Sequence, residues 1–314
     1  MSQTNISLLD RRFPAPSAIL ELLKPVTWFA AMWAFFCGVI SSGAPALDRL
    51  PFIFGGVLLA GPFACAASQA VNDWFDRDVD AINQPARPIP SGRLPGRWGF
   101  YIAIFWSLAT LCLGAALGPW AFGASAVATA LAWAYSAPPF RLKSNGWLGA
   151  AAVGFSYEGI AWFTGAAVMV GTLPRVEIIW LAILYSIGAH GIMTLNDFKA
   201  VKGDKALGLR SLPVQLGPAR AAQVACGFMI VPQLIVALWL GLAGAPIHAG
   251  GLIVLVIAQC ALMPTLLKDP CAKAPWYNAT GTSLYVSGMM VAAFAVRILD
   301  ADPVVSSVEL ILGS

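Results

Sequence analysis

The stretch PFIFGGVLLAGPFACAASQAV, residues 51–71, runs without interruption into NDWFDRDVD, residues 72–80. The first part is mostly apolar and long enough to cross a lipid bilayer as a helix, which takes about 20 residues. The second part places four carboxylates within nine positions. A membrane helix that ends in a dense acidic cluster predicts an all-α membrane protein with a polar site where the helix leaves the membrane.

The composition of the whole chain supports a membrane location. Of its 314 residues, 59% are hydrophobic and 11% are charged, whereas soluble domains carry about 25% charged residues. Nine stretches can form spanning helices, although a count of eight stays open, because the fourth stretch is short and almost touches the third. The nine predicted spans are residues 26–43, 51–71, 99–118, 120–135, 146–167, 176–195, 218–241, 248–267 and 281–299.

The positive charges predict how the chain is oriented. Cytoplasmic loops of membrane proteins carry an excess of Lys and Arg. With nine spans and a cytoplasmic N-terminus, all but three of the 19 Lys and Arg fall on the cytoplasmic side, the exceptions being Arg49, Arg175 and Arg297. We therefore expect a multi-pass protein of the bacterial cytoplasmic membrane. No basic run indicates nucleic acid binding.

This topology divides the chain into three parts. A cytoplasmic segment at 1–25 carries no apolar run, so no cleaved signal peptide is expected. One transmembrane domain covers 26–299, and a periplasmic tail covers 300–314. The loops expected to form the site, all cytoplasmic, are residues 72–98, 136–145 and 196–217.

An internal repeat organises the domain. Asn72-Asp73 ends the second span and Asn196-Asp197 ends the sixth, and an Arg-x-x-Pro sequence follows 15 residues after Asn72 and 14 residues after Asn196. We read this as two four-helix pseudo-repeats in parallel orientation with one further helix. An even number of helices separates the two motifs, so both should lie at the same face and meet across one cavity.

The first motif has the pattern of a metal site. On a helix, Asn72, Asp76 and Asp80 share one face. Magnesium is a suitable counter-ion for such crowded carboxylates, since it takes oxygen ligands and usually binds one or two carboxylates together with water and phosphate. A solvated acidic loop is the alternative. The duplication of the motif and the flanking arginines favour the metal site.

The second motif is weaker, because Asp197 and Asp204 are accompanied by Lys199 and Lys202. By itself it is equally compatible with a solvated loop. Its pairing with the first motif across a repeat favours a second half of the same metal-binding site.

Basic residues near both motifs indicate a phosphate ligand. Arginine binds phosphate oxygens through two parallel hydrogen bonds, which explains why both signs of charge gather at one face. Positive charge on cytoplasmic loops is the simpler alternative. The arginines framed by proline are the strongest candidates, and the prolines after the fourth span are expected to direct three further side chains inward. The candidates are Arg87, Arg210, Arg93, Lys143, Arg141, Lys199, Lys202 and Tyr135, the last equally compatible with an interfacial aromatic belt.

These motifs resemble those of the UbiA-type intramembrane prenyltransferases. The shared patterns are N-D-x-x-D-x-x-x-D at 72–80, R-P-I-P-S-G-R at 87–93, Y-S-x-P-P at 135–139 and the Asp197 motif. The resemblance covers almost the whole chain. It implies nine helices around a central cavity, Mg²⁺ as cofactor, and a metal and diphosphate site formed by Asn72, Asp76, Asp80, Asp197 and Asp204.

Within this family, the run from 196 to 214 and the sequence F-S-Y-E-G at 155–159 are similar to chlorophyll and bacteriochlorophyll synthases. The resemblance implies transfer of a geranylgeranyl or phytyl group from its diphosphate to the propionate of (bacterio)chlorophyllide a. The residues expected to act in catalysis are Asp76, Asp80, Arg87, Lys143 and Asp204. We also expect association with other pigment-synthesis membrane proteins.

One departure weakens the second motif. Many relatives carry an aspartate four residues before the last aspartate of this motif, where this chain has Ala200. The second half is therefore expected to hold a metal of its own or, alternatively, to contact diphosphate directly through Lys199 and Lys202.

Two membrane-embedded polar residues stand out, Glu158 near the middle of the fifth predicted span and His190 about two turns before Asn196. Ionisable groups at membrane depth are costly and usually functional. We expect one of them to orient the tetrapyrrole, by reaching its central magnesium or a ring substituent. An interhelical hydrogen bond between buried polar groups is the alternative for each.

Two other classes of function stay open at this point. One is prenyl transfer to a different acceptor, such as a quinone precursor, homogentisate or haem. The other is a transporter or pigment-binding membrane protein without enzymatic activity, which would release no diphosphate from a prenyl donor.

Overall fold

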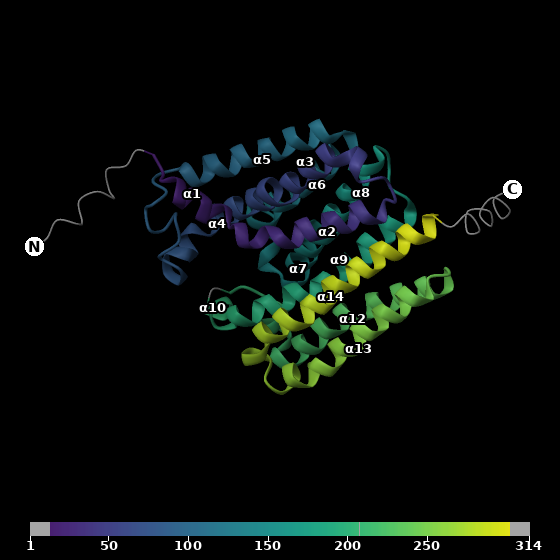
Figure 1. Cartoon of the computed structure of the whole chain (residues 1–314). Coiled ribbons are helices and arrows are strands. Elements are labelled where there is room, and N and C mark those ends of the chain that lie inside the picture. The colour runs from purple at the N-terminus through teal and green to yellow at the C-terminus, as the bar shows by residue number, and fades with distance from the viewer. Residues whose placement is uncertain (1–12, 207, 302–314) are drawn as a thin grey trace, which may run out of the picture.

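The computed structural model describes residues 13–206 and 208–301. These residues form helices throughout, and the described part of the chain contains no β-strand beyond one isolated bridge between Asn145 and Arg210. Figure 1 shows the long helices running side by side, with the earlier part of the chain in one group and α9 to α14 in another. The predicted all-α membrane fold is confirmed.

The elements follow one another with short connections, and in several places consecutive helical elements join without a break. The bounds are α1 Pro16–Leu23, η1 Pro25–Thr27, α2 Trp28–Ser41, η2 Leu47–Arg49, α3 Leu50–Leu58, η3 Leu59–Cys65, α4 Ala66–Asn83, α5 Trp98–Leu117, α6 Pro119–Ser136, η4 Leu142–Ser144, α7 Gly146–Gly154, η5 Phe155–Ile160, α8 Ala161–Val170, α9 Val176–Asp197, η6 Phe198–Ala200, α10 Val201–Ala206, α11 Leu212–Leu216, α12 Pro218–Leu242, α13 Pro246–Lys268 and α14 Pro270–Ala301.

The helix boundaries have a local cause in the sequence. Proline stands in the first turn of α1, α6, α12 and α13. Proline suits this position, because its missing N–H would be unpaired there and its fixed φ angle is helical. Two of these continuous helices contain a π-helical segment, η3 between α3 and α4 and η5 between α7 and α8.

Within the described residues, eight helical segments are long and apolar enough to cross a membrane. The predicted count of nine is therefore not confirmed. The difference falls on α6, which forms a helix of 18 residues at the predicted place but is not among the eight. Its sequence consists largely of alanine, with tryptophan, tyrosine and serine, and this composition lowers its hydropathy.

The structure describes part of the predicted N-terminal segment and part of the first predicted loop as helix. Helix α1 occupies the second half of the segment 1–25 and joins the first candidate span, Pro16–Ser41. Residues 72–83, expected to begin a loop, are the last turns of α4. The hydrogen bonds of the helix continue through the acidic motif because cations neutralise its carboxylates, as described below. Residues 1–12 and 302–314, and hence most of the predicted tail, lie outside the described residues.

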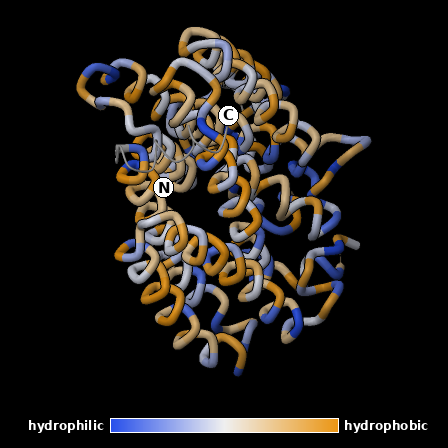
Figure 2. The backbone as a smooth tube through the Cα atoms, turned by 90° about the vertical axis from the view of Figure 1, so that its right-hand side faces the viewer, coloured by the Kyte–Doolittle hydropathy of each residue, from blue (hydrophilic) through white to orange (hydrophobic). Residues whose placement is uncertain are grey.

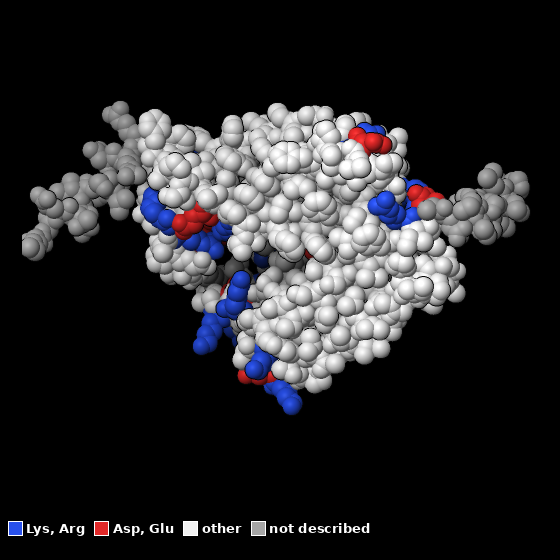
Figure 3. All heavy atoms as spheres, in the orientation of Figure 1, with Lys and Arg blue, Asp and Glu red and all other residues white. Residues whose placement is uncertain are grey.

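On the face shown in Figure 3, charged side chains gather toward the ends of the helices and leave a nearly uncharged surface between them. At the end away from the acidic motifs, Arg175 forms an ion pair of 2.8 Å with Asp300, and Arg49 lies close to Gly171. Figure 2 looks roughly along the helices and shows their backbones arranged around the centre of the molecule. This distribution agrees with helices that cross a membrane.

Helices α2 and α8 cross at a close contact between two glycines. Gly38 of α2 and Gly165 of α8 face each other so closely that a methyl group added to Gly38 would lie 2.0 Å from the carbonyl oxygen of Trp162. A methyl group on Gly165 would lie equally close to the carbonyl oxygen of Phe35. Small residues at such crossings let the backbones of membrane helices approach one another.

We predict that Gly38→Ala destabilises the protein by about 1–3 kcal/mol, since the added methyl group meets backbone atoms that cannot move aside cheaply. The measurement is thermal unfolding of the purified protein in detergent. Gly227→Ala in α12 is the matched control, because nothing lies within 4 Å of a methyl group at that position. Equal stability of the two variants would contradict the role of this crossing.

Candidate active site

Two adjoining cavities lie between the helices. The smaller one, about 340 Å³, carries polar and charged side chains over about half of its lining, and the larger one, about 620 Å³, is mostly apolar. Asn72, Tyr135 and Met193 line both cavities. Polar and apolar ligand groups could therefore be held next to each other, with the boundary between them at these three residues.

The first acidic motif enters the polar cavity from α4. Asn72, Asp76 and Asp80 all line it, as expected for residues spaced by four along one helix face. The remaining carboxylates of the motif point elsewhere. Asp73 is 2% exposed and turns to the other side of α4, whereas the side chain of Asp78 is 86% exposed.

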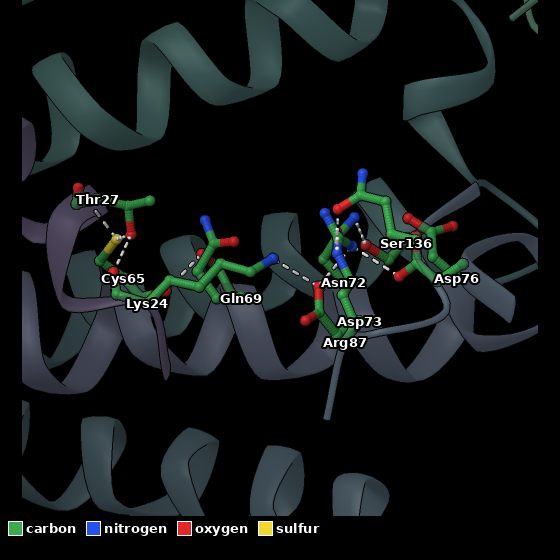
Figure 4. A network of polar contacts seen from close by, with 12 residues as sticks. Lys24, Thr27, Cys65, Gln69, Asn72, Asp73, Asp76, Arg87 and Ser136 are labelled. Carbon is green, nitrogen blue, oxygen red and sulfur yellow. Dashed lines mark hydrogen bonds and ion pairs between the residues drawn. The ribbon is translucent and has the colours of Figure 1, made fainter. Parts of the chain in front are cut away.

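Arg87 and Lys24 neutralise the buried carboxylates of this motif. Arg87 donates through Nη1 to Asp80 at 2.6 Å and to Asp73 at 3.2 Å, and its Nε donates to the side chain of Gln84. Lys24 donates to Asp73 at 2.6 Å. Figure 4 shows the Lys24 side chain extending along α4 toward Asp73, with Arg87 and Asn72 beside it. Arg87, predicted from the sequence to bind phosphate, therefore lies at the centre of an ion-pair network with these carboxylates.

Asp76 has its own cations, contributed by the segment after α6. Lys143 donates to Asp76 at 2.6 Å, and an Arg141 Nη2 atom lies 3.6 Å from the same oxygen. Burial lowers the pKa of the Lys143 ammonium, and the Asp76 carboxylate opposes this shift. The buried Nε of Arg141 has no hydrogen-bond partner. Arg141 lines the polar cavity, and its ion pair with Asp76 leaves this N–H group without a partner.

The second motif completes the opposite wall. Asp197 at the end of α9, Ala200 and Asp204 line the same polar cavity as the first motif. Ser211 donates to Asp204 at 2.6 Å. Asn196 lines the larger cavity instead and accepts a hydrogen bond of 2.8 Å from Asn278 of α14. The two motifs thus meet across one cavity, as the repeat predicts.

The structure does not bring every predicted residue to this place. Arg93 forms a two-point ion pair with Glu21 of α1 and lines neither cavity. Arg210 and Lys202 are exposed and also line neither, whereas Lys199 borders the larger cavity. The roles assigned to these residues stay predictions.

The two membrane-embedded candidates are placed differently. Glu158 lies on η5 and lines the larger cavity. His190 lines neither cavity, because its ring stacks on Phe228 at 4.3 Å and its Nε2 contacts the carbonyl oxygen of Trp147.

Several contributing residues were not singled out from the sequence. Lys24 is 49 residues from Asp73 in the chain, and nothing in the motif indicates the pair. Ser136 accepts a long hydrogen bond from Asn72 at 3.4 Å, and Ser211 holds Asp204. For Ser136 and Ser211 there was a weak signal, since each stands beside a predicted site residue.

The donor set fits magnesium bound together with phosphate. The described residues contain no group of three or more His, Cys, Asp or Glu side chains placed to hold a metal by themselves. Magnesium needs only one or two carboxylates, with phosphate and water completing its shell. The carboxylate oxygens around the polar cavity, on Asp76, Asp80, Asp197 and Asp204, meet this requirement.

Comparison with known proteins agrees with the fold and the motifs. Residues 24–294 match the UbiA prenyltransferase family. The chain is 53% identical to the bacteriochlorophyll synthase 33 kDa chain of Cereibacter sphaeroides, over 95% of this chain and 99% of that protein. It is 40% identical to the chloroplastic chlorophyll synthase of Oryza sativa subsp. japonica, over 88% of this chain and 76% of that protein.

A solved structure shares the fold. A UbiA homolog from Archaeoglobus fulgidus, determined with DMAPP and Mg²⁺, superposes with a TM-score of 0.63 at 21% identity, covering 85% of this chain and 99% of that one. The family predicted from the motifs, and with it the prenyltransferase class of enzyme, is confirmed. The chain belongs to the UbiA prenyltransferase family.

Proposed function

We propose that this protein transfers a geranylgeranyl or phytyl group from its diphosphate to the propionate carboxylate of (bacterio)chlorophyllide a. The observation that carries the proposal is the pair of adjoining cavities, one polar and bordered by both aspartate motifs, the other apolar and about 620 Å³. The 53% identity to a bacteriochlorophyll synthase over almost the whole chain supports the choice of acceptor.

The diphosphate is assigned to the polar cavity. Asn72, Asp76 and Asp80 would hold Mg²⁺ from one side, with Asp197 and Asp204 on the other. When bound, Mg²⁺ supplies positive charge that stabilises the departing diphosphate. Because Ala200 occupies the position of a further aspartate, we assign most of the metal binding to the first motif.

Cations of the chain act on the same charge. Arg87, Arg141 and Lys143 are bound to carboxylates in the structure, and they lie where phosphate oxygens can become their partners. Donors that are already positioned stabilise negative charge as it develops, without reorganisation during the reaction. They thereby favour breaking of the allylic C–O bond, with the electron pair leaving on the diphosphate.

The acceptor is assigned to the apolar cavity together with the prenyl chain. A propionate is already ionised at neutral pH, so it can attack the allylic carbon without a general base. The lining agrees with this, since no histidine is found among the residues that line the two cavities in the described part of the chain. A phenol or aromatic carbon would instead have to lose a proton.

The membrane placement follows from the charge distribution. We assign the protein to the cytoplasmic or intracytoplasmic photosynthetic membrane, with the N-terminus and the polar cavity on the cytoplasmic side, where most Lys and Arg fall. Association with other pigment-synthesis proteins stays a prediction.

The proposal is tested with purified protein, Mg²⁺, geranylgeranyl diphosphate or phytyl diphosphate, and a panel of acceptors. We expect a prenyl ester of bacteriochlorophyllide or chlorophyllide, detected by mass spectrometry, with release of one diphosphate per ester. Chelation of Mg²⁺ by EDTA should abolish both products, and added Mg²⁺ should restore them. A product formed only with a quinone precursor, homogentisate or haem would identify a different acceptor. Absence of diphosphate release with every acceptor would contradict prenyl transfer by this protein.

We predict that Asp76→Asn and Asp80→Asn each lower kcat roughly 100-fold or more, because each removes a charge from the wall of the polar cavity. Initial rates of ester formation measure this. Asp78→Asn is the matched control, since its side chain lies in the same motif but is 86% exposed and lies 3.7 Å from Arg77. A similar loss in the control would argue against a specific site on the inner face of α4.

A second prediction separates the two arginines of the sequence RPIPSGR. Arg87→Gln should raise the KM for the prenyl diphosphate and lower kcat, since Arg87 borders the larger cavity and contacts Asp80, which lines the polar one. Arg93→Gln should leave the KM unchanged, because Arg93 contacts Glu21 instead. Steady-state kinetics measures both. A raised KM in Arg93→Gln, with its fold intact by circular dichroism, would place Arg93 in the site.

A further inference from the structure

Glu158 is a buried carboxyl group without a partner in the protein. The residue is 6% exposed and lines the larger cavity from η5. Its side chain forms no hydrogen bond and no ion pair with any residue of the described ranges 13–206 and 208–301. The other buried polar group considered for the tetrapyrrole, His190, lies outside this cavity.

The position of Glu158 makes its lack of a partner costly. It lies at the middle of the candidate span Gly146–Val170. An unpaired polar group at membrane depth costs several kcal/mol. The π-helical turn that carries it is a type of distortion frequently found at functional sites. A ligand that supplies the missing partner would explain both features.

The protein's own cations cannot be that partner. Lys24, Arg87 and Lys199 are the basic residues that border the larger cavity. Lys24 and Arg87 are bound to Asp73 and Asp80, and Lys199 is exposed. The hydroxyl of the neighbouring Tyr157 is likewise engaged, with Cys65 at 3.0 Å and Gln69 at 3.1 Å. None of these groups is paired with Glu158 in the structure, and a substrate in the cavity can supply the partner.

Of the two substrates, only one offers a suitable group. A prenyl chain is a hydrocarbon and cannot satisfy a carboxyl group. A magnesium tetrapyrrole carries a metal centre that binds four ring nitrogens and takes a further axial ligand, and magnesium prefers oxygen. Glu158 follows Ala150, which borders the polar cavity, by eight residues, a helical rise of about 12 Å. The two positions are therefore separated by a distance of the same order as that from a propionate carboxylate to the centre of its macrocycle.

We propose that Glu158 binds the central magnesium of the acceptor through a carboxylate oxygen and so positions the macrocycle with its propionate toward the allylic carbon. This inference rests on the proposed function, since it takes a magnesium tetrapyrrole as the acceptor. Glu158 is then a positioning residue, because it touches the metal of the acceptor and not the reacting atoms. Its contribution should depend on the metal in the macrocycle.

The test compares binding of bacteriochlorophyllide a with binding of the same macrocycle lacking magnesium, measured by tryptophan fluorescence quenching without a prenyl donor. Wild-type protein should bind the magnesium form at least about tenfold more tightly. Glu158→Leu, which removes the side-chain oxygens, should lose this preference by weakening only the magnesium form. The absorption band that reports the coordination number of magnesium should shift on binding to wild-type protein and not on binding to the variant.

Glu177→Leu, at the start of α9 and away from both cavities, is the control and should behave as wild type. Equal weakening of both macrocycles by Glu158→Leu would overturn the ligand role and indicate general packing. If the variant does not fold, the wild-type comparison still decides, because equal affinity for both macrocycles would overturn the inference. Ester formation is assayed separately, so a wild-type protein that forms the ester but ignores the metal refutes this inference and not the proposed function.

Discussion

The ion pairs of Arg87 with Asp73 and Asp80 are the interaction on which the rest of the site depends. They join the loop after α4 to two faces of that helix. Lys24 also binds Asp73 and thereby joins the segment before α2 to the same helix. A buried carboxylate without a cation would be strongly unfavourable at a membrane boundary. The network therefore lets two buried carboxylates, Asp73 and Asp80, stand close together at the end of an apolar helix. It also defines what a ligand must do, because a diphosphate has to compete for cations that already have partners.

The two halves of the site differ in how their carboxylates are neutralised. Asp76, Asp80 and Asp73 of the first motif each contact a cation, whereas Asp204 of the second motif is held by the hydroxyl of Ser211. A hydroxyl neutralises no charge. Since Ala200 also removes one carboxylate from that wall, the duplicated motifs have become unequal. The first motif is suited to exchange cations for metal and phosphate, and the second adds oxygen ligands with fewer charges to displace.

The sequence predicted those parts of the structure that follow from local periodicity. The inward face of α4 is an example, because residues spaced by four on a helix must share a face. The pairing of Lys24 with Asp73, and of Arg93 with Glu21, joins residues far apart in the chain and depends on how α1 packs against α4. His190 was indistinguishable from Glu158 as a buried polar residue, and only the packing of α9 turns it toward Phe228. Helix α6 shows the same limit, since its alanines form a good helix without the hydropathy of a typical span.

The boundary between the two cavities constrains the chemistry further. In the proposed reaction, the allylic carbon must lie where the polar cavity ends, because its diphosphate needs cations and its hydrocarbon chain needs apolar walls. Asn72, Tyr135 and Met193 occupy that boundary. A cation-like carbon formed there would be captured by any water that reached it. Filling the apolar cavity with the prenyl chain and a flat macrocycle would exclude water from this position, so occupancy by both substrates, more than any single side chain, would decide between esterification and hydrolysis.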